Sequence, residues 1–497
     1  MQQFLLGLDI GSSSVKASLV EAETGKTVVS DQSPSEEMEM VATQAGWAEQ
    51  DPDLWWEHAV KSIKSCLSKS GIDSSAIAAI GIAYQMHGLV AVDKNGKPVR
   101  HSIIWCDSRA VQIGEKAFKD LGSDFCLSHF LNSPGNFTAS KLKWVKENEP
   151  AIYEKIDKVM LPGDYIAYKL TGEITTTDTG LSEGIFWDYQ SNSVSSDLLS
   201  YYKIDQSLIA KIKPVFSVQG QVNEKAAVEL GLKKGTKVSY RSGDQPNNAF
   251  SLNVLKPGET AATAGTSGVI YSVTDQNSYD PKSRVNTFIH VNNEAKAKRN
   301  GVLLCVNGTG ILNSWLRKNL KSGNAYEYQQ INDLAKQSPI GAEGLSILPF
   351  GNGVERILEN KVIEASFHGL NFNQHNQSHL FRAAQEGIVF ALKYGFEILQ
   401  GMGVKTQVIR AGHANMFLSP LFREAFVNTI DARVELYDTD GAKGAALGAG
   451  VGAGVYSSFE EAFKGLHLIQ SEDPKQNLKD QYNEAYQRWK LILNKTL

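Results

Sequence analysis

The stretch that decides the fold lies at the start of the chain and reads Phe4-Leu5-Leu6-Gly7-Leu8-Asp9-Ile10-Gly11-Ser12-Ser13-Ser14-Val15-Lys16. An apolar run ends near Asp9, a Gly/Ser turn follows, and a second run continues with alternating apolar residues. A further turn at 23–26 and the pair Val28-Val29 complete a predicted β-meander. The first turn offers hydroxyl and backbone N–H groups that can cradle a phosphate, although an Asp-x-Gly turn alone is more often only a turn.

A related pattern occurs in the second half of the chain. Residues 259–264 lead into Gly265-Thr266-Ser267-Gly268, and an apolar run follows at 269–273. We interpret the two patterns as a duplication of a fold rather than of a sequence, because a period of roughly 250 residues is far longer than that of repeat arrays. The sequence contains no G-x-x-x-x-G-K-[ST] motif, so a bound nucleotide would be held by two such turns across a cleft between domains.

The bulk properties exclude several classes of protein. A length of 497 residues predicts two domains, and 42% hydrophobic with 21% charged residues is an ordinary globular composition. The net charge of −4 and the absence of a Lys/Arg run argue against nucleic acid as a partner. The first apolar stretch is too short for a signal peptide, and no later stretch is long enough to cross a membrane. Four scattered cysteines predict neither a disulfide framework nor a zinc site, which favours a cytoplasmic location.

Two further segments could carry chemistry. Asp53 to Leu67 has helical spacing, and the apolar run at 77–83 predicts a buried strand that ends at Gln85-Met86-His87-Gly88. His87 could contact sugar hydroxyls or serve as a structural histidine, and no second histidine stands at a spacing suited to a metal. Asp244 follows the run Val238-Ser239-Tyr240 and could accept the proton of an attacking hydroxyl, or it could simply cap a helix that starts near Asn247.

Two patterns concern packing. The apolar stripe between Leu380 and Leu399 predicts a central helix of the second half. Glycines crowd residues 441–454, which predicts a helix packed closely against a sheet or a nucleotide, or equally a close-packed helix of small residues.

Taken in order, these segments resemble the FGGY family of carbohydrate kinases, and within it the xylulokinase branch, over nearly the whole chain. Other segments also keep the order of the family: Trp47-Ala48-Glu49-Gln50-Asp51-Pro52 with Trp55-Trp56, Trp105-Cys106-Asp107-Ser108-Arg109, Pro134-Gly135-Asn136-Phe137-Thr138-Ala139 before Lys141-Leu142, Leu161-Pro162-Gly163-Asp164-Tyr165, Leu170-Thr171-Gly172-Glu173 and Leu348-Pro349-Phe350.

The resemblance implies an α/β fold of two ribonuclease-H-like domains of the actin and hexokinase type, with an active-site cleft between them. Residues 1–245 would form the sugar-binding domain, with the first phosphate loop and the catalytic aspartate at its end, and residues 246–497 the nucleotide-binding domain. The implied reaction is ATP-dependent phosphorylation of a ketopentose, foremost D-xylulose to D-xylulose 5-phosphate, with Asp244 as general base.

The resemblance also assigns the binding residues. Magnesium is implied because it bridges the β- and γ-phosphates, and Asp9 would lie near it through water. The sugar site would contain Gln85, Met86, His87, Trp105, Asp107, Phe137 and Gln245. The nucleotide site would contain Asp9, Gly11, Ser12, Ser13, Ser14, Lys16, Gly265, Thr266, Ser267, Gly310, Gly412 and Asn415.

Some residues depart from the family pattern. Gln245 stands where xylulokinases usually carry asparagine and is closer to the glycerol kinase pattern. The Gln85–Gly88 segment and Phe137, in contrast, differ from the glycerol kinase pattern. We give this segment and Phe137 more weight than Gln245. Residues 411–415 lack the usual triple glycine, which affects the expected adenosine contacts. The alternatives are the same chemistry on another ketose, a polyol or a sugar acid, and a non-catalytic sugar sensor or an ATPase of the actin-like superfamily. The expected partners are a sugar and ATP, and a homodimer stays open.

Overall fold

The structure is a computed structural model that describes residues 2–320 and 325–497. The chain forms two compact units, each built from three segments. The first unit comprises Met1–Asn253, Phe288–Asn300 and Thr439–Leu466, and the second comprises Val254–Thr287, Gly301–Asp438 and His467–Leu497. The division of the chain into domains 1–245 and 246–497 stays a prediction.

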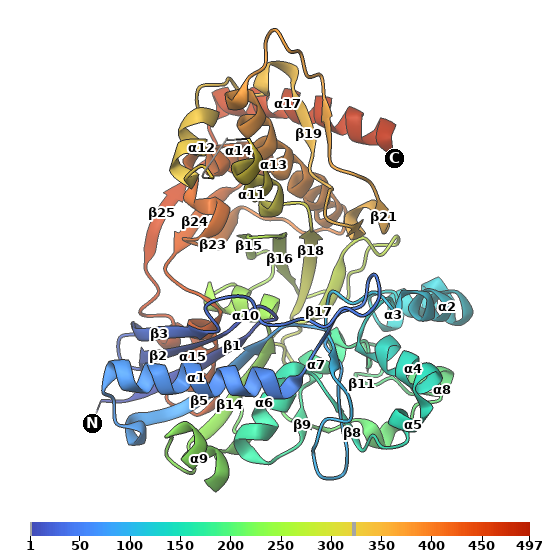
Figure 1. The fold of residues 1–497 in the computed structure, drawn as a ribbon, viewed down its shortest axis with the longest axis vertical. Coiled ribbons are helices and arrows are strands. Elements are labelled where there is room, and N and C mark those ends of the chain that lie inside the picture. Colours follow the sequence, from blue (N-terminus) through green and yellow to red (C-terminus); the bar gives the residue numbers. More distant parts are fainter. Residues whose placement is uncertain (1, 321–324) are drawn as a thin grey trace. The chain divides into compact units, whose positions relative to one another are not determined.

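The first unit is built on a six-stranded sheet (Figure 1) in the order β13-β14-β5-β1-β2-β3. Its strands are β1 (Phe4–Ile10), β2 (Val15–Glu21), β3 (Thr27–Ser33), β5 (Ile77–Tyr84), β13 (Gly220–Gln221) and β14 (Lys237–Gly243). Short turns join β1, β2 and β3 as antiparallel neighbours, which confirms the predicted meander. β1, β5 and β14 run parallel, so longer connections must join them. The connection from β1 to β5 contains helix α1 (Pro52–Ser70).

The two faces of this sheet are covered differently. Because side chains alternate along a strand, Leu6, Leu8 and Ile10 point to one face, where they share a hydrophobic core with Trp55 and Ile63 of α1. Gly7 and Gly81 point to the other face, which is covered by α15 (Gly441–Gly452). A Cβ at Gly7 would collide with the carbonyl oxygen of Ala442, and a Cβ at Gly81 with that of Ala445. The glycine-rich segment is therefore a helix of small residues packed directly on the sheet.

Smaller elements complete the first unit. They are the strands β4 (Glu49–Gln50), β6 (Val90–Val92), β7 (Ser102–Ile103), β8 (Lys158–Met160), β9 (Thr175–Thr176), β10 (Trp187–Asp188), β11 (Ser193–Val194) and β12 (Lys211–Ile212), and the helices α2 (Val111–Leu121), α3 (Ser123–His129), α4 (Thr138–Asn148), α5 (Pro150–Tyr153), α6 (Pro162–Thr171), α7 (Asp178–Glu183), α8 (Ser196–Tyr202), α9 (Glu224–Leu230), α10 (Asp244–Ser251) and α16 (Phe459–Ala462).

The second unit contains a seven-stranded sheet in the order β17-β18-β16-β15-β23-β24-β25. β15 pairs antiparallel with β16 and parallel with β23, β23 pairs parallel with β24, and β25 closes the edge antiparallel. The strands are β15 (Thr260–Ala264), β16 (Gly268–Thr274), β17 (Asn286–Ile289), β18 (Asn300–Val306), β23 (Val408–Gly412), β24 (Arg433–Tyr437) and β25 (Leu468–Glu472). A hairpin followed by two parallel strands is the pairing order of the first sheet as well.

The predicted central helix of the second half is confirmed as α13 (Gln377–Gly401), whose start is capped by the Asn376 side chain. Its apolar residues form the core of the second unit with α14 (Pro420–Ile430) and α17 (Gln476–Thr496). The other elements of this unit are α11 (Gly310–Asn319), α12 (Tyr328–Ala335), β19 (Ser346–Leu348), β20 (Val354–Glu355), β21 (Lys361–Val362) and β22 (Ser366–His368).

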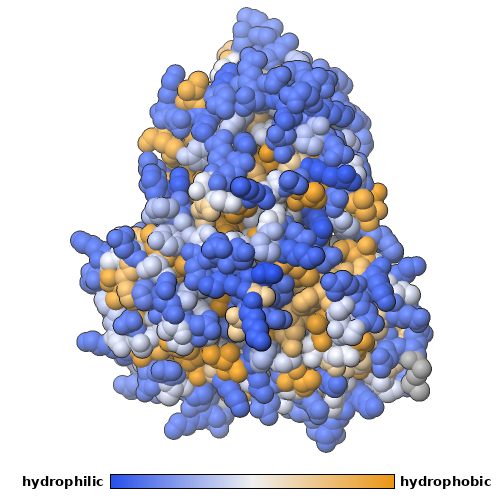
Figure 2. Space-filling view, turned by 180° about the vertical axis from the view of Figure 1, so that it is seen from behind, coloured by the Kyte–Doolittle hydropathy of each residue, from blue (hydrophilic) through white to orange (hydrophobic). Residues whose placement is uncertain are grey.

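Hydrophobic side chains on the face drawn in Figure 2 are interspersed with hydrophilic ones. Individual apolar residues are nevertheless well exposed, among them Phe372 (91%) and Val228 (77%). Within residues 2–320 and 325–497, none of the helices is both long and apolar enough to span a bilayer.

Candidate active site

The candidate site of the first unit lies where its parallel strands end. Ile10 and Gly243 are both register partners of Tyr84, the last residue of β5. Gly11, Gln85 and Asp244 therefore leave the sheet side by side. Ligand contacts in open α/β sheets gather at this edge, because the chain there turns away from the strands and exposes its side chains.

Asp244 is the first residue of helix α10, so this helix begins three residues earlier than the sequence predicted. Gly243 takes the N-cap position, so Asp244 lies inside the first helical turn. Burial raises the pKa of Asp244 to about 6, against the opposing effect of hydrogen bonds from Gln245 and the backbone. At neutral pH the carboxylate is therefore mostly ionised and only weakly acidic when protonated, which suits a general base.

Asp9 lies on the face of β1 that is turned toward α15. A Cβ at Gly441 would collide with the Asp9 carboxylate, so glycine at the start of this helix makes room for the acid. Asp440 caps α15 by accepting the Lys443 N–H at 2.8 Å, and it also pairs with Lys16 from β2. Two segments more than 400 residues apart in the chain thus share one acidic cluster.

The acidic cluster carries an excess of negative charge. Burial first, and then the charges of Asp244 and Asp440, raise the pKa of Asp9 to about 7, although Lys16 acts in the opposite direction. Among the described residues, no three or more His, Cys, Asp or Glu side chains form a group that could hold a metal ion. A single carboxylate crowded by two others nevertheless fits Mg²⁺, which prefers oxygen ligands and usually keeps several of its waters.

The segment after β5 places Met86 beside Gly243, the residue that precedes Asp244. Met86 is buried, and its side chain makes this contact. His87 has a left-handed backbone (φ 61°), which is uncommon for a residue with a side chain. Its Nδ1 lies 3.0 Å from the carbonyl oxygen of Glu183, and because a carbonyl only accepts, Nδ1 carries the hydrogen.

The other predicted sugar residues lie on several segments of the first unit. Phe137 meets the His87 ring edge-on, with the ring centroids 4.8 Å apart. Gln85 donates its backbone N–H to Ile10 (2.8 Å), and Gln245 follows Asp244 in α10. Trp105 is 47% exposed and lies 3.3 Å from the Ser12 hydroxyl, which connects the predicted sugar residues with the first turn.

Asp107 is buried and its carboxylate is already engaged by the protein. It accepts the Ala48 N–H at 2.6 Å and forms an ion pair with Arg109 at 2.7 Å. These contacts give Asp107 a structural role, and its contact with a sugar stays a prediction.

The turn of the first unit closes on itself, because Gly11 donates its N–H to the Ser14 carbonyl at 3.0 Å. Ser12 and Ser13 lie within this turn, where the carbonyl of Ser13 accepts the N–H of Met38 at 2.9 Å. This is the hairpin that the sequence predicted between the first two strands.

The second unit gathers the remaining predicted nucleotide residues. Gly310 donates its N–H to the Gly265 carbonyl at 3.0 Å, and the carbonyl of Thr266 accepts the N–H of Ile311 at 3.2 Å. Ser267 completes this turn, and Asn415, with φ 54°, places its amide next to Gly265. Gly412 is the last residue of β23, which is parallel to β15, so it ends at the same sheet edge.

Three buried ionisable residues were not among the predicted site residues. Lys141 donates from Nζ to two backbone carbonyls, and burial lowers its pKa to about 8. Glu183 packs against Gly243, and burial raises its pKa well above the usual value. Glu355 accepts the N–H groups of Asn307 and Gly308, just before Gly310, and burial raises its pKa to about 7. Only burial distinguishes these residues, and a single sequence does not reveal it.

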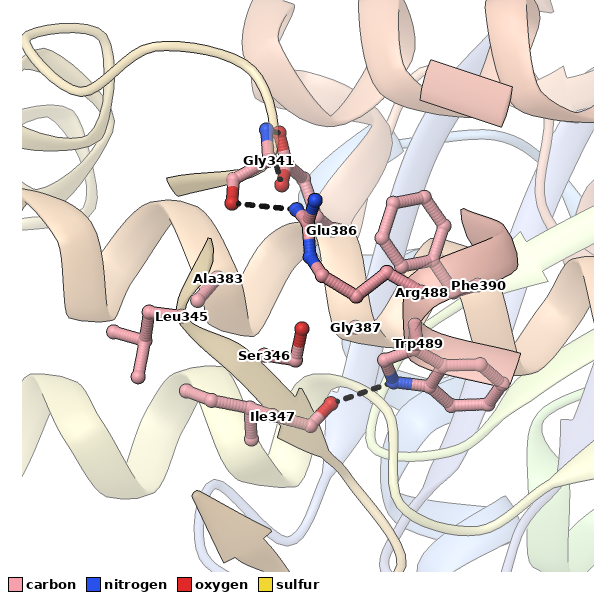
Figure 3. Close-up of a pocket in the computed structure, with 10 residues that line it drawn as sticks. All are labelled: Gly341, Leu345, Ser346, Ile347, Ala383, Glu386, Gly387, Phe390, Arg488 and Trp489. Atoms are coloured by element: carbon pink, nitrogen blue, oxygen red, sulfur yellow. Dashed lines mark hydrogen bonds between the residues drawn. The ribbon is translucent and has the colours of Figure 1, made fainter. Parts of the chain in front are cut away.

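The second unit contains a separate small pocket (Figure 3), and residues that line it form hydrogen bonds with one another. Arg488 donates to the Gly341 carbonyl at 3.0 Å, and the Trp489 indole donates to the Ile347 carbonyl at 2.8 Å. All of its lining residues differ from the predicted site residues: Gly341, Leu345, Ser346, Ile347, Ala383, Glu386, Gly387, Phe390, Arg488 and Trp489. We regard it as a packing feature of the core around α13.

Comparison with known proteins identifies the family of the chain. Residues 4–251 match the N-terminal domain of the FGGY family of carbohydrate kinases, and residues 260–456 match its C-terminal domain. The chain is 29% identical over 462 residues to a xylulose kinase of Staphylococcus xylosus, a match that covers 92% of each chain. The crystal structure of xylulose kinase from Rhodospirillum rubrum superposes with a TM-score of 0.87 at 25% identity and covers 99% of both chains.

The structure of Plasmodium falciparum glycerol kinase with ADP superposes with a TM-score of 0.88 and covers 100% of this chain and 98% of that one. At 20% identity this likeness concerns the fold alone. The expected α/β fold of two actin- and hexokinase-type domains is confirmed. The chain belongs to the FGGY family of carbohydrate kinases.

Proposed function

We propose that this protein transfers the γ-phosphate of ATP to a primary hydroxyl of D-xylulose, giving D-xylulose 5-phosphate and ADP. ATP is the phosphoryl donor that membership of a kinase family implies. The observation that carries the proposal is Asp244, an acid with a pKa of about 6 that leaves the sheet beside Gln85 and packs near Met86.

In the proposed reaction the Asp244 carboxylate accepts the proton of the acceptor hydroxyl while the new O–P bond forms and the bond to ADP breaks. His87 and Phe137 would orient the sugar, and the turns at 11–14 and 265–267 would contact phosphate groups through their N–H and hydroxyl groups. Asp9 would hold Mg²⁺ through water, and the ion when bound would neutralise charge on the β- and γ-phosphates.

The choice of D-xylulose rests on the residues that differ between the branches and on the xylulose kinases that the chain resembles. A second acceptor class, a polyol or a sugar acid, is favoured by one observation: Gln245 directly follows the proposed base and resembles the glycerol kinase pattern. The four cysteines Cys66, Cys106, Cys126 and Cys305 are scattered without the spacing of a disulfide framework, which supports a reducing cytoplasm as the location. Whether the protein forms a homodimer stays a prediction.

The test is to mix the purified protein with Mg-ATP and D-xylulose, D-ribulose, L-ribulose, D-fructose, glycerol or D-gluconate, and to follow ADP release. We expect the highest kcat/KM with D-xylulose. Preference for another acceptor would retain the kinase and overturn the substrate. Release that is independent of any acceptor would favour an ATPase, and thermal stabilisation by a sugar without ADP release would favour a sensor.

A further inference from the structure

Lys141 is a fully buried cation of the first unit that donates hydrogen bonds to two backbone carbonyls. It lies on α4 and its side chain is inaccessible to solvent. Its Nζ donates to the carbonyl oxygen of His87 and to that of Ile104, both at 2.9 Å. Burying an ammonium group is costly unless its hydrogen bonds are satisfied, so a lysine at this position requires a specific role.

The two acceptors belong to the two loops that carry the proposed sugar contacts. His87 has a left-handed backbone conformation, and its carbonyl oxygen accepts a hydrogen bond from Lys141. Ile104 directly precedes Trp105, so the second hydrogen bond fixes the point at which that loop leaves β7. Phe137 stands immediately before α4 and touches the His87 ring. One side chain therefore connects three separate segments of the first unit.

The ring of His87 is fixed from the opposite side. The Glu183 carbonyl accepts from Nδ1 at 3.0 Å, while the rings of Phe137 and Phe288 lie 4.8 and 5.4 Å from its centroid. With the backbone held by Lys141 and the ring held by these contacts, the direction of the imidazole is determined by the protein before any ligand arrives. Such preorganisation lowers the cost of binding, because the side chain has little freedom left to lose.

We propose that Lys141 is a positioning residue for the acceptor sugar, which acts by holding His87 and the loop that begins at Trp105. It does not contact the sugar itself. The proposal rests on the proposed function, because it requires that His87 and Trp105 contact the acceptor.

The test compares Lys141→Met with Lys143→Met. Methionine keeps the length of the side chain but donates no hydrogen bond. Lys143 lies on the same helix and pairs with Glu147 at 2.9 Å, so its replacement controls for the loss of a lysine from α4. For Lys141→Met we expect an acceptor KM at least ~10-fold higher and an ATP KM changed less than ~2-fold, whereas Lys143→Met changes neither. An unchanged acceptor KM, or equal changes in both KM values, would overturn the proposal.

A double-mutant cycle separates positioning from a general loss of stability. If Lys141 acts through His87, the effect of Lys141→Met on the acceptor KM will be smaller in a His87→Ala background than in the natural protein. Additive effects would overturn this part of the proposal. Should Lys141→Met fail to fold, Lys141→Gln can still donate to one carbonyl, and an intermediate increase in the acceptor KM is expected for it.

The failure of the proposed function has a different signature. If the natural protein prefers an acceptor other than D-xylulose, the same comparison of KM values is made with that acceptor. If it phosphorylates no acceptor, the proposed function fails while the positioning contact can still be measured. In that case the NMR signals of the His87 ring, assigned with His87→Gln, shift in Lys141→Met if the contact holds the ring. Unchanged signals would overturn the proposal independently.

Discussion

The two hairpin turns of this protein occupy the same position in two sheets with the same pairing order, yet their surroundings differ. In the first unit the strand before the turn carries Asp9, with Asp244 and Asp440 close enough to raise its pKa. In the second unit Thr263 stands two residues before Gly265, as Asp9 stands two residues before Gly11. The turn of the first unit therefore lies next to several carboxylates, whereas a threonine and backbone N–H groups lie next to the turn of the second unit.

The difference shows that the fold supplies the positions and that the residue types at the strand ends supply the chemistry. Carboxylates at the first edge suit proton transfer and a cation. The second unit also has a buried acid nearby, Glu355, but its carboxylate is occupied by the N–H groups of Asn307 and Gly308. In the second unit the acid supports a loop, whereas in the first unit Asp9 and Asp244 are the acids that we propose for chemistry.

The contrast between the two turns would fail most clearly if the protein needed no carboxylate at the strand ends of the first unit. Asp244→Asn keeps the size of the side chain but removes its ability to accept a proton. We expect turnover at saturating substrates to fall by about 10²- to 10⁴-fold, with the folded state retained. Asp53→Asn is the matched control, because Asp53 also lies in the first turn of a helix and pairs with Lys169. Retention of more than about a tenth of the turnover by Asp244→Asn would contradict the assignment of the base.

Replacing Asp9 tests whether its buried carboxylate lowers the stability of the folded protein. The pKa of Asp9 is raised from 3.8 to about 7, so between these values the folded protein binds more protons than the unfolded chain. Stability therefore falls as the pH rises through this range. After allowance for partial exposure, we expect Asp9→Asn to raise the free energy of unfolding at pH 8 by about 1–3 kcal/mol, and activity to fall.

The measurement is urea denaturation of both proteins at pH 4 and pH 8. The gain from Asp9→Asn should disappear at pH 4, where the natural Asp9 is largely protonated in the folded state. Thr263→Val, at the corresponding position of the second unit, should show no such dependence on pH. A gain that is equal at both pH values would mean that burial of charge is not its cause.

The pH–rate profile tests the role of the Asp244 carboxylate, with a smaller expected effect than its replacement. Because Asp244 must be ionised to accept a proton and its pKa is raised to about 6, kcat/KM should fall on the acid side of pH 6. We expect a loss of about tenfold per pH unit well below that value. The profile is measured with the preferred acceptor between pH 5 and pH 8. A flat profile down to pH 5 would show that the essential base titrates lower.

The sequence predicted the hairpins well because their signals are local. The turn at 11–14 lies between β1 and β2, and the turn at 265–267 lies between β15 and β16. The contacts that complete the site are not local. α15 reaches the first sheet from almost 200 residues beyond β14, and its docking depends on Gly7 and Gly81, which could equally have marked bends or turns.

The ionisable residues behind the site were harder to predict for a similar reason. Lys141 and Glu183 are charged residues in helices, a pattern typical of solvated surfaces. Their burial depends on loops that meet only in three dimensions. Helix α10 begins three residues earlier than predicted, and it includes Pro246, which is well accommodated in the first turn of a helix.

The smallest expected effect concerns the acid of the second unit. Glu355 accepts the N–H groups of Asn307 and Gly308 at 3.1 and 3.0 Å, and a glutamine at this position has only one oxygen to offer both. Because Gly310 follows in the same loop, we expect Glu355→Gln to raise the ATP KM about 2- to 5-fold and to leave the acceptor KM unchanged. Glu359→Gln is the control, since that carboxylate is exposed and pairs with Lys282.

A dependence on pH distinguishes this role from a general disturbance of the loop. Burial raises the pKa of Glu355 to about 7, so its protonation below that value weakens both hydrogen bonds and should raise the ATP KM of the natural protein as the pH falls from 8 to 6. Glu355→Gln cannot titrate and should lack this step. If the step persists in the variant, the group responsible lies elsewhere, and the acid of the second unit would then serve only the packing of its loop.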